Sequence, residues 1–276
     1  MTTLHSRRMG IAGGLPALLA HCFLGHGGSW RPLVEALPVP LDALVPDLPG
    51  HGQSPAPEAP GDFHALTAAA LGALIDRPSL LIGHSFGAAS LLRHALHHPA
   101  QVTGLVLIEP VFFAAAEGSA AHAPYRALEA PLHEAVTAGD LAEAARLFLA
   151  LNPGSPDFDR LPPTAQAGMA AQMRLVTATR AGLFEDSGGL LQPGVMERFD
   201  KPVLIILGSG TTPIFRATLS GLQQRLPDVT AATIQGAGHM VPLSHAPQTA
   251  ATIHAWMMAK GLEPGLAEAT ENPRAG

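Results

Sequence analysis

Short apolar runs alternate along most of the chain with longer stretches that have helical spacing. The apolar runs predict strands at Pro16–His21, Ala43–Pro46, Leu80–Ile82, Val102–Ile108, Val203–Leu207 and Thr230–Ile234. The stretches between them predict helices at Trp30–Leu37, Asp62–Ile75, Ser85–His98 and Ser244–Met258. Nearly continuous apolar strands that alternate with helices are typical of a parallel sheet covered on both faces, so the pattern indicates an α/β protein.

The middle of the chain breaks this rhythm. No convincing strand occurs from Val111 to Asp200, where the spacing predicts helices at Ala123–Glu134, Gly139–Leu151 and Pro163–Thr179. A helical insertion between two core strands predicts a cap over the carboxyl ends of the sheet, where ligands bind in such folds. The expected division is therefore a core of residues 1–110 and 200–276 and a helical cap of residues 111–199. The polar tail from Gly261 onward is expected to be loose.

Composition excludes several classes of protein. Of the 276 residues, 47% are hydrophobic and only 14% charged, and the net charge of −6 gives no reason to expect a nucleic-acid partner. The single cysteine, Cys22, excludes an internal disulfide and a zinc cluster. The apolar run Ile11–Leu24 is interrupted by Pro16 and His21 and is too short to span a membrane, so we expect a cytoplasmic protein. The sequence leaves the oligomeric state open.

The most informative motif is Gly83–Gly87, which has the pattern G-x-S-x-G and follows the apolar run that ends at Ile82. A serine between a strand and a helix in this pattern is held on a sharp turn, with its hydroxyl exposed as a nucleophile. The motif alone also fits an ordinary turn between a strand and a helix. We expect Ser85 to be a nucleophile if suitable partners occur elsewhere in the chain.

His239 is the candidate partner. It ends the segment Gly236–His239, which lies just after the last predicted strand. A histidine at the carboxyl end of a strand can reach the serine, accept its proton and return that proton to a leaving group. A solvated loop histidine is the alternative interpretation.

These motifs together resemble the α/β-hydrolase-fold superfamily over nearly the whole chain. The matching segments follow the family's order and spacing: His21–Gly25, Asp47–Ser54, Gly83–Gly87 and Gly236–His239. The resemblance implies a mostly parallel eight-stranded sheet with helices on both faces and a helical cap. It also implies the chain order serine, acid, histidine, and hydrolysis through a covalent acyl-enzyme.

The first departure from the family's pattern is Cys22, where relatives usually have glycine after the histidine. The resemblance implies that the backbone N–H groups of Phe23 and Phe86 form the oxyanion hole, and backbone donors tolerate a changed side chain. We do not expect Cys22 to act as a nucleophile, because nothing in the sequence places a base beside it.

The second departure concerns the acid. Most relatives carry it in the loop after the penultimate strand, but here Gly208–Pro213 holds no carboxylate. Glu109 follows the strand after the serine helix, and some relatives use an acid at that position. We therefore expect Glu109 to orient His239, with a purely structural role for Glu109 as the alternative.

Other polar and aromatic residues have more general interpretations. Asp47, His51 and His84 are expected to be structural. A substrate pocket is expected to involve Phe112, Phe113, Phe148 and Met240, with Leu183 and Phe184 as further candidates. Ordinary core packing is the alternative for each of these apolar residues.

The expected function is hydrolysis of a carboxylic ester or lactone of a small apolar acyl compound, with no metal and no cofactor. The serine argues against dehalogenase and epoxide-hydrolase chemistry, which uses an aspartate nucleophile in this family. One alternative is a C–C bond hydrolase or a lyase like those of the menaquinone pathway. Such enzymes usually need a basic patch, for which Arg93, Arg126, Arg174 and Arg180 are candidates. A non-catalytic small-molecule receptor is the other alternative.

Overall fold

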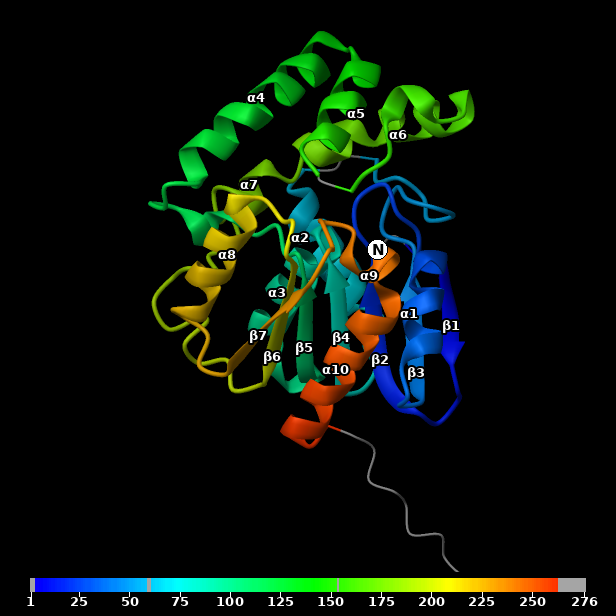
Figure 1. Ribbon diagram of the computed structural model, residues 1–276, viewed down its shortest axis with the longest axis vertical. Helices are drawn as coiled ribbons and strands as arrows, with labels where there is room; N and C mark the ends of the chain where they lie inside the picture. Colours follow the sequence, from blue (N-terminus) through cyan, green and yellow to red (C-terminus); the bar gives the residue numbers. More distant parts are fainter. Residues whose placement is uncertain (1–2, 59–60, 153, 263–276) are drawn as a thin grey trace, which may run out of the picture.

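A seven-stranded sheet forms the centre of the computed structural model, which describes residues 3–58, 61–152 and 154–262 (Figure 1). The strands are β1 (Ser6–Gly10), β2 (Leu15–Ala20), β3 (Leu41–Pro46), β4 (Ser79–His84), β5 (Val102–Ile108), β6 (Val203–Gly208) and β7 (Val229–Ile234). Their order is β1-β3-β2-β4-β5-β6-β7, and only β1 runs antiparallel to its neighbour. The expected α/β-hydrolase sheet is confirmed, with seven strands in the described residues rather than eight.

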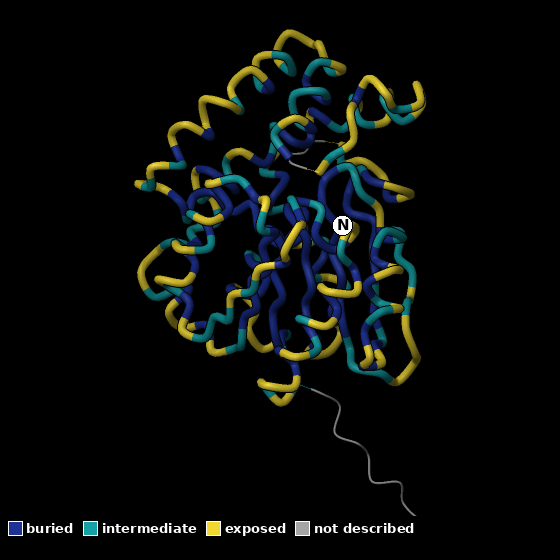
Figure 2. Tube along the Cα trace, viewed as in Figure 1, coloured by how far each residue is buried: buried dark blue, intermediate teal, exposed yellow. Residues whose placement is uncertain are grey.

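Helices cover both faces of this sheet. One face packs against α2 (Phe63–Gly72), α3 (Phe86–His97) and α8 (Pro213–Gln223), whose apolar side chains join one hydrophobic cluster. The other face packs against α1 (Arg31–Ala36) and α10 (Ala246–Lys260), and α9 (Val241–Ser244) precedes α10. Figure 2 shows the central strands β4, β5 and β6 as deeply buried, whereas the edge strands β1 and β7 are mostly intermediate or exposed.

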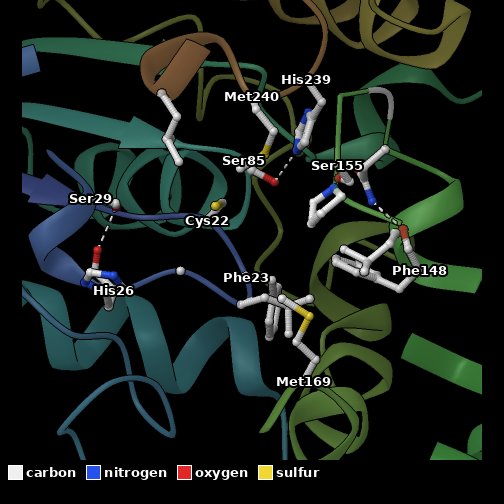
Figure 3. A pocket seen from close by; sticks show the side chains of 16 residues that line it. Cys22, Phe23, His26, Ser29, Ser85, Phe148, Ser155, Met169, His239 and Met240 are labelled. Carbon is white, nitrogen blue, oxygen red and sulfur yellow. Dashed lines mark hydrogen bonds between the residues drawn. The ribbon is translucent and has the colours of Figure 1, made fainter. Parts of the chain in front are cut away.

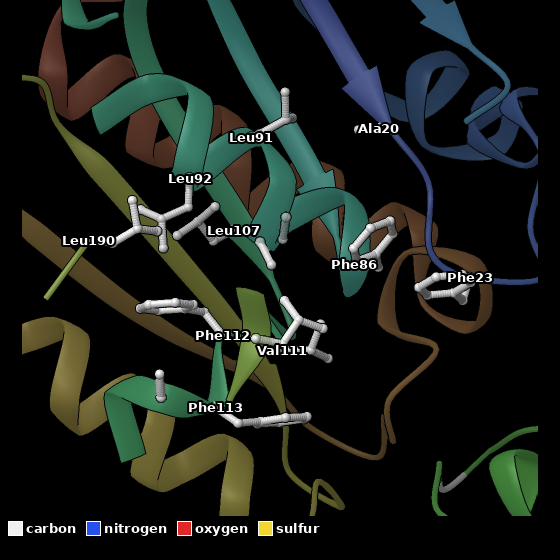
Figure 4. Packing of buried hydrophobic residues seen from close by; sticks show 14 of the residues in the cluster. Ala20, Phe23, Phe86, Leu91, Leu92, Leu107, Val111, Phe112, Phe113 and Leu190 are labelled. Atoms are coloured by element: carbon white, nitrogen blue, oxygen red, sulfur yellow. The ribbon is translucent and has the colours of Figure 1, made fainter. Parts of the chain in front are cut away.

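The alternation of side chains along β5 shows how the two clusters form. Leu105 and Leu107 belong to the cluster with α3, and Val106 and Ile108 belong to the cluster with α10. All four are fully buried. Because successive side chains of a strand point to opposite faces, a strand buried on both sides must be apolar at every position. Figure 4 shows the first cluster around Leu107 and Phe112.

The segment between β5 and β6 is helical, as expected. It contains α4 (His122–Ala138), α5 (Leu141–Ala150), α6 (Pro163–Thr177) and α7 (Arg180–Leu183), and no strand among its described residues. In Figure 1, α4, α5 and α6 lie beyond one end of the sheet, at the top of the view. Short 3-10 turns occur at Gly27–Trp30, Pro99–Gln101, Phe113–Ala116 and Phe158–Arg160.

The first and last described segments pack on the core through Leu4 and Leu262. The expected loose tail falls, from residue 263 onward, outside the described residues. Within the described chain, no helix has both the length and the apolar content needed to cross a bilayer.

Candidate active site

Ser85 lies on the tight turn that the G-x-S-x-G motif predicts. It follows β4 directly, precedes α3, and has a left-handed φ of 56°. Both glycines are required by close backbone contacts. A Cβ on Gly83 would lie 2.4 Å from the Ala88 Cα, and one on Gly87 would lie 2.3 Å from the Ala20 carbonyl oxygen. The motif therefore lets β2, β4 and α3 approach closely enough to hold the serine at the end of the sheet.

Ser85, His239 and Glu109 form a continuous hydrogen-bonded chain. The Oγ of Ser85 lies 3.0 Å from Nε2 of His239, and Nδ1 of the same ring lies 3.3 Å from Oε2 of Glu109. All three residues are buried, with exposed fractions of 7%, 4% and 0%. This is the geometry that a nucleophile, a general base and an orienting acid require.

The strand register explains why Ser85 and Glu109 meet. His84 and Ile108 are paired at the ends of the parallel strands β4 and β5, so the next residue of each strand lies at the same edge. The N–H of Ser85 donates to the Ile108 carbonyl (2.9 Å), which fixes the two strand ends together. His239 reaches this edge from the loop that follows β7.

The Glu109 carboxylate accepts hydrogen bonds from the last residue of β6 and from the loop that follows this strand. The Gly208 N–H donates to Oε1 over 2.7 Å, and the Thr211 hydroxyl donates to Oε2 over 2.7 Å. These two donors and the Nδ1–H of His239 satisfy a carboxylate that is fully buried, which is costly without such partners. Thr211 was not predicted from the sequence, although its place in the loop between Gly208 and Pro213 was the available signal.

Strained backbone is concentrated at this site. Four non-glycine residues of the described chain have a left-handed φ, and three of them are Leu24 (62°), Ser85 (56°) and Glu109 (48°). The fourth is Asp186, which lies in the loop after α7. Each such conformation costs about 1–3 kcal/mol and persists only where the surrounding structure enforces it.

His84 positions the histidine loop. Its Nε2–H donates to the backbone carbonyl of His239 over 2.9 Å, and the two rings lie 5.1 Å apart. Burial and the neighbouring His239 lower the pKa of His84 to about 3, so its ring stays neutral. The structural role expected for His84 agrees with this contact.

The segment Cys22–Gly25 forms the opposite wall of the site. Its Cys22 carbonyl accepts the Nδ1–H of His21 over 2.7 Å and the N–H of Gly25 over 3.2 Å. Nε2 of His21 accepts the N–H of Leu48 over 2.9 Å, so both ring nitrogens are used and the tautomer is fixed. Burial lowers the pKa of His21 to about 3.

These bonds also orient the N–H that was expected to join an oxyanion hole. In a planar trans peptide the C=O and N–H point in opposite directions, so holding the Cys22 carbonyl holds the Phe23 N–H. Among the described residues, neither the Phe23 nor the Phe86 N–H is the donor of a hydrogen bond to another protein group. Both stay available to a ligand beside Ser85.

Cys22 itself is a buried thiol that faces the cavity beside Ser85 (Figure 3). Burial raises the pKa of this thiol to about 12, which leaves it protonated at neutral pH. Its surroundings agree with the expectation that Cys22 is not a nucleophile.

Asp47 ties the surrounding loops together. Its carboxylate accepts the N–H groups of Gly27 (2.6 Å) and Gln53 (3.0 Å) and pairs with Arg7 (3.2 Å) on β1. These partners hold the pKa of Asp47 below its usual value, although burial opposes them. His51 donates from Nδ1 to the Pro49 carbonyl (2.9 Å) within the same loop. Both residues are structural, as the sequence suggested.

A cavity of about 250 Å³ opens beside Ser85 and His239. Its described lining contains no Asp, Glu, Lys or Arg, and it includes Phe148 and Met240, as expected for a substrate pocket. Figure 3 shows Phe148 and Met169 on the side opposite His26 and Ser29. Met169 was missed from the sequence, because nothing in a helical insertion indicates which face of each helix meets the core.

A second cavity of about 40 Å³ also reaches Ser85. It is lined by Phe113, Leu183 and Phe184 among others, so three further pocket candidates lie near the serine. Phe112 is placed differently. It is fully buried in the core beside Leu190 (Figure 4) and lines neither of these two cavities.

Within the described residues, no group of three or more His, Cys, Asp or Glu side chains is arranged to hold a metal ion. The four arginines considered as a basic patch line neither cavity. Arg93 instead pairs with Asp62 over 3.0 Å.

Comparison with known proteins gives the family. A family model described as "Alpha/beta hydrolase family" matches residues 17–252. The chain belongs to the α/β hydrolase family. This agrees with the sheet order, with the position of Ser85 between β4 and α3, and with the resemblance seen in the sequence motifs.

Several curated members of the α/β hydrolase family are similar in sequence. The pimeloyl-[acyl-carrier protein] methyl ester esterase of Aromatoleum aromaticum is 32% identical over 222 residues, which cover 78% of this chain and 87% of that protein. Lipase LipV of Mycobacterium tuberculosis is 41% identical over 112 residues, which cover only 39% of this chain and 41% of that protein.

Solved structures show the same fold at lower identity. The 2-hydroxy-6-oxo-6-phenylhexa-2,4-dienoate hydrolase of a Rhodococcus species superposes with a TM-score of 0.72 at 18% identity, over 92% of this chain and 94% of that one. A loop variant of a haloalkane dehalogenase from Bradyrhizobium elkanii gives 0.67 at 20% identity, over 93% of each chain. These likenesses concern the fold alone.

Proposed function

We propose that this α/β hydrolase is a serine hydrolase that cleaves a carboxylic ester or lactone of a small apolar acyl compound. The observation that carries the proposal is the buried chain from Ser85 through His239 to Glu109. His239 takes the Ser85 proton at Nε2 while Oγ forms a bond to the carbonyl carbon. Glu109 holds the ring by its Nδ1–H and stabilises the imidazolium that results.

The negative charge that develops on the substrate oxygen needs donors on the opposite side. The N–H groups of Phe23 and Phe86 supply them in this proposal. Such donors lower the barrier because they are in place before the charge forms, and one of them is worth about 2.7–4 kcal/mol in enzymes of this kind.

Collapse of the tetrahedral intermediate breaks the bond to the leaving oxygen, and His239 gives its proton to that oxygen. Water then repeats the sequence: His239 takes a proton from water, the hydroxide attacks the acyl carbon, and Ser85 leaves with the proton restored. One ester and one water give one carboxylic acid and one alcohol, or one hydroxy acid from a lactone, so the atoms balance with water as the only other reactant.

The lining of the larger cavity supports an apolar substrate. Its described lining contains no Asp, Glu, Lys or Arg, and His26 and His239 are its only titratable side chains apart from Cys22. Neither cavity has a Lys or Arg in its described lining to pair with a substrate carboxylate. That absence from the described lining favours an ester over the carboxylate-bearing substrates of the C–C hydrolase and lyase alternative. The similarity to proteins named esterase and lipase supports the same choice.

We also propose that residues 111–199 act as the cap over a core of residues 1–110 and 200–276. This insertion contributes Phe148 and Met169 to the cavity beside Ser85, and Tyr125 to the smaller one. A cytoplasmic location, a small-molecule substrate and the absence of a cofactor remain predictions from the sequence.

The test is hydrolysis of a panel of p-nitrophenyl esters by the wild-type protein and by Ser85→Ala. The proposal expects release of p-nitrophenol by the wild type and loss of at least about 10³-fold in the variant. Tight binding of a small molecule without turnover would instead favour the receptor alternative. Cleavage of a vinylogous diketone without ester cleavage would favour the C–C hydrolase.

A further inference from the structure

Ser85 lies at the junction of two separate cavities. Both cavities include Ser85, Phe23, Phe148 and Asn152 in their linings, and their other residues differ. The first cavity continues toward His26 and Leu243 at the protein surface. The second continues beneath the helices of the insertion, among aromatic side chains.

Two aromatic rings separate the cavities. Phe23 and Phe148 meet edge to face with ring centroids 6.4 Å apart, and Phe23 also packs against Phe86 at 4.4 Å. Phe23 belongs to the segment Cys22–Gly25 of the core, and Phe148 belongs to α5 of the insertion. This pair of rings, called the partition below, therefore joins the core of the fold to the insertion. A substrate whose carbonyl lies at Ser85 must extend one of its two parts to each side of these rings.

His239 distinguishes the two sides. It lines the first cavity together with Met240, but it does not line the second. His239 must deliver its proton to the leaving oxygen, so that oxygen and its alcohol lie on the His239 side. Resting on the proposed function, we propose that the first cavity receives the alcohol part of the ester and the second receives the acyl part.

The sizes of the cavities then give a substrate class. The alcohol cavity measures about 250 Å³ and reaches the surface at Leu243, which is 43% exposed. The acyl cavity measures only about 40 Å³, and Phe113, Phe184 and the buried Tyr125 pack together in its lining with ring centroids 4.8–6.3 Å apart. The enzyme therefore prefers short acyl groups and accepts alcohols of varied length.

The described lining of the acyl cavity contains one acidic side chain, Glu129. Glu129 lines it beside Tyr125, and burial and Glu129 both raise the pKa of the Tyr125 hydroxyl. The Oε2 of Glu129 lies 3.4 Å from Nε2 of His133, which does not line the cavity, and no Lys or Arg in the described lining could pair with a carboxylate at the end of an acyl chain. Long dicarboxylic half-esters are therefore disfavoured by both length and charge.

Two series of esters test the proposal. In p-nitrophenyl acetate, butyrate and octanoate only the acyl part changes, and kcat/KM is expected to fall at least about tenfold from butyrate to octanoate. In methyl, butyl and octyl butyrate only the alcohol changes, and kcat/KM is expected to stay within about threefold or to rise. The reverse pattern, with long acyl groups accepted and long alcohols rejected, overturns the proposal.

Substitutions at Phe148, between the two cavities, and at Leu243, in the alcohol cavity, give a second test of the proposal. Phe148→Ala joins the cavities and is expected to raise the octanoate-to-butyrate ratio about tenfold, with Phe148→Leu giving a smaller rise. Leu243→Ala is the matched variant on the alcohol side and should change the octyl-to-methyl ratio only. Equal changes of the acyl ratio in Phe148→Ala and Leu243→Ala, or none in either, overturn the assignment. Failure of the folded wild-type protein to cleave any ester would instead overturn the proposed function.

Discussion

The Thr211 hydroxyl donates to the Glu109 carboxylate over 2.7 Å, although the two residues lie 102 positions apart in the chain. The loop after β6, where relatives usually carry the acid, thus supplies a donor to an acid that comes from the end of β5. Because β5 and β6 are neighbours in the sheet, a carboxylate from either strand end can reach the same imidazole.

This arrangement makes Thr211 a positioning residue. Thr211→Val removes one of the donors to a buried carboxylate and frees that carboxylate to turn away from His239, so kcat is expected to fall about tenfold with KM little changed. Thr211→Ser keeps the hydroxyl and should retain most of the activity. Steady-state kinetics of the two variants on one ester measures this. Equal losses in both would contradict a role for the hydroxyl.

His21 is expected to act through the oxyanion hole. His21→Phe removes the shorter of the two hydrogen bonds to the Cys22 carbonyl and leaves only the 3.2 Å bond from the Gly25 N–H, so the Phe23 N–H is held less firmly toward the substrate. We expect kcat to fall about 10²-fold, since loss of one such donor costs 10²–10³-fold in a serine protease. Affinity for a trifluoromethyl ketone, which mimics the tetrahedral intermediate, should fall in parallel, while KM changes little.

A purely structural effect of His21→Phe would give a different result. It would lower the free energy of unfolding, because the Leu48 N–H loses its acceptor, but it would leave the activity of the folded fraction unchanged. Comparing kcat per folded molecule with the ketone affinity separates the two cases.

The protein should lose stability as the pH falls below 6.5, which is well above the pH range in which carboxylates titrate. Burial lowers the pKa of His21 and His84 to about 3 and that of His51 and His64 to about 4, whereas each has its ordinary value of 6.5 when unfolded. The unfolded chain therefore binds more protons below pH 6.5, and stability is lost as the pH falls through that value. At pH 5 each of the four histidines costs roughly 2 kcal/mol.

Denaturant titrations at pH 8, 7, 6 and 5 measure this effect. The free energy of unfolding should be nearly constant between pH 8 and 7 and should fall steeply below pH 6. A free energy that stays flat down to pH 5 would contradict the assignment of these rings as buried and neutral.

Cys22 should be unreactive in the native protein. Its thiol has a pKa of about 12 because it is buried, so the thiolate needed for alkylation is scarce at pH 8. Iodoacetamide is expected to leave both the mass and the esterase activity unchanged until denaturant is added, when one adduct forms. Rapid loss of activity with one adduct on native protein would show that Cys22 is accessible and ionised.

The sequence predicted most of the core because its strands are buried on both faces. Runs such as Val102–Ile108 are apolar at every position, and this pattern is difficult to mistake. The strand β1 was missed because it is a short edge strand that carries Arg7 and Arg8 and is only partly buried. The helix α8 (Pro213–Gln223) was not predicted either.

The polar residues of the site could be predicted from the sequence, but most of the cavity walls could not. Ser85, His239 and Glu109 could be chosen because their side chains come from strand ends, and parallel strand ends meet at one edge of a sheet. The cavity walls depend on how the helices of the insertion pack on the core, which a single sequence does not specify. The sequence predicted both Phe112 and Phe148 as pocket residues, but the structure has only Phe148 beside Ser85 and buries Phe112 in the core.

In the proposed mechanism, Ser85 reacts only because His239, held by Glu109, takes its proton. Stopped-flow measurement of the acylation rate with p-nitrophenyl acetate in Glu109→Gln tests this dependence, with Glu35→Gln on the exposed face of α1 as the control. We expect a loss of at least about 10²-fold in Glu109→Gln, because the amide no longer fixes the tautomer of His239, and no loss in Glu35→Gln. An acylation rate in Glu109→Gln within about threefold of the wild-type rate would show that Glu109 is not needed for proton transfer from Ser85.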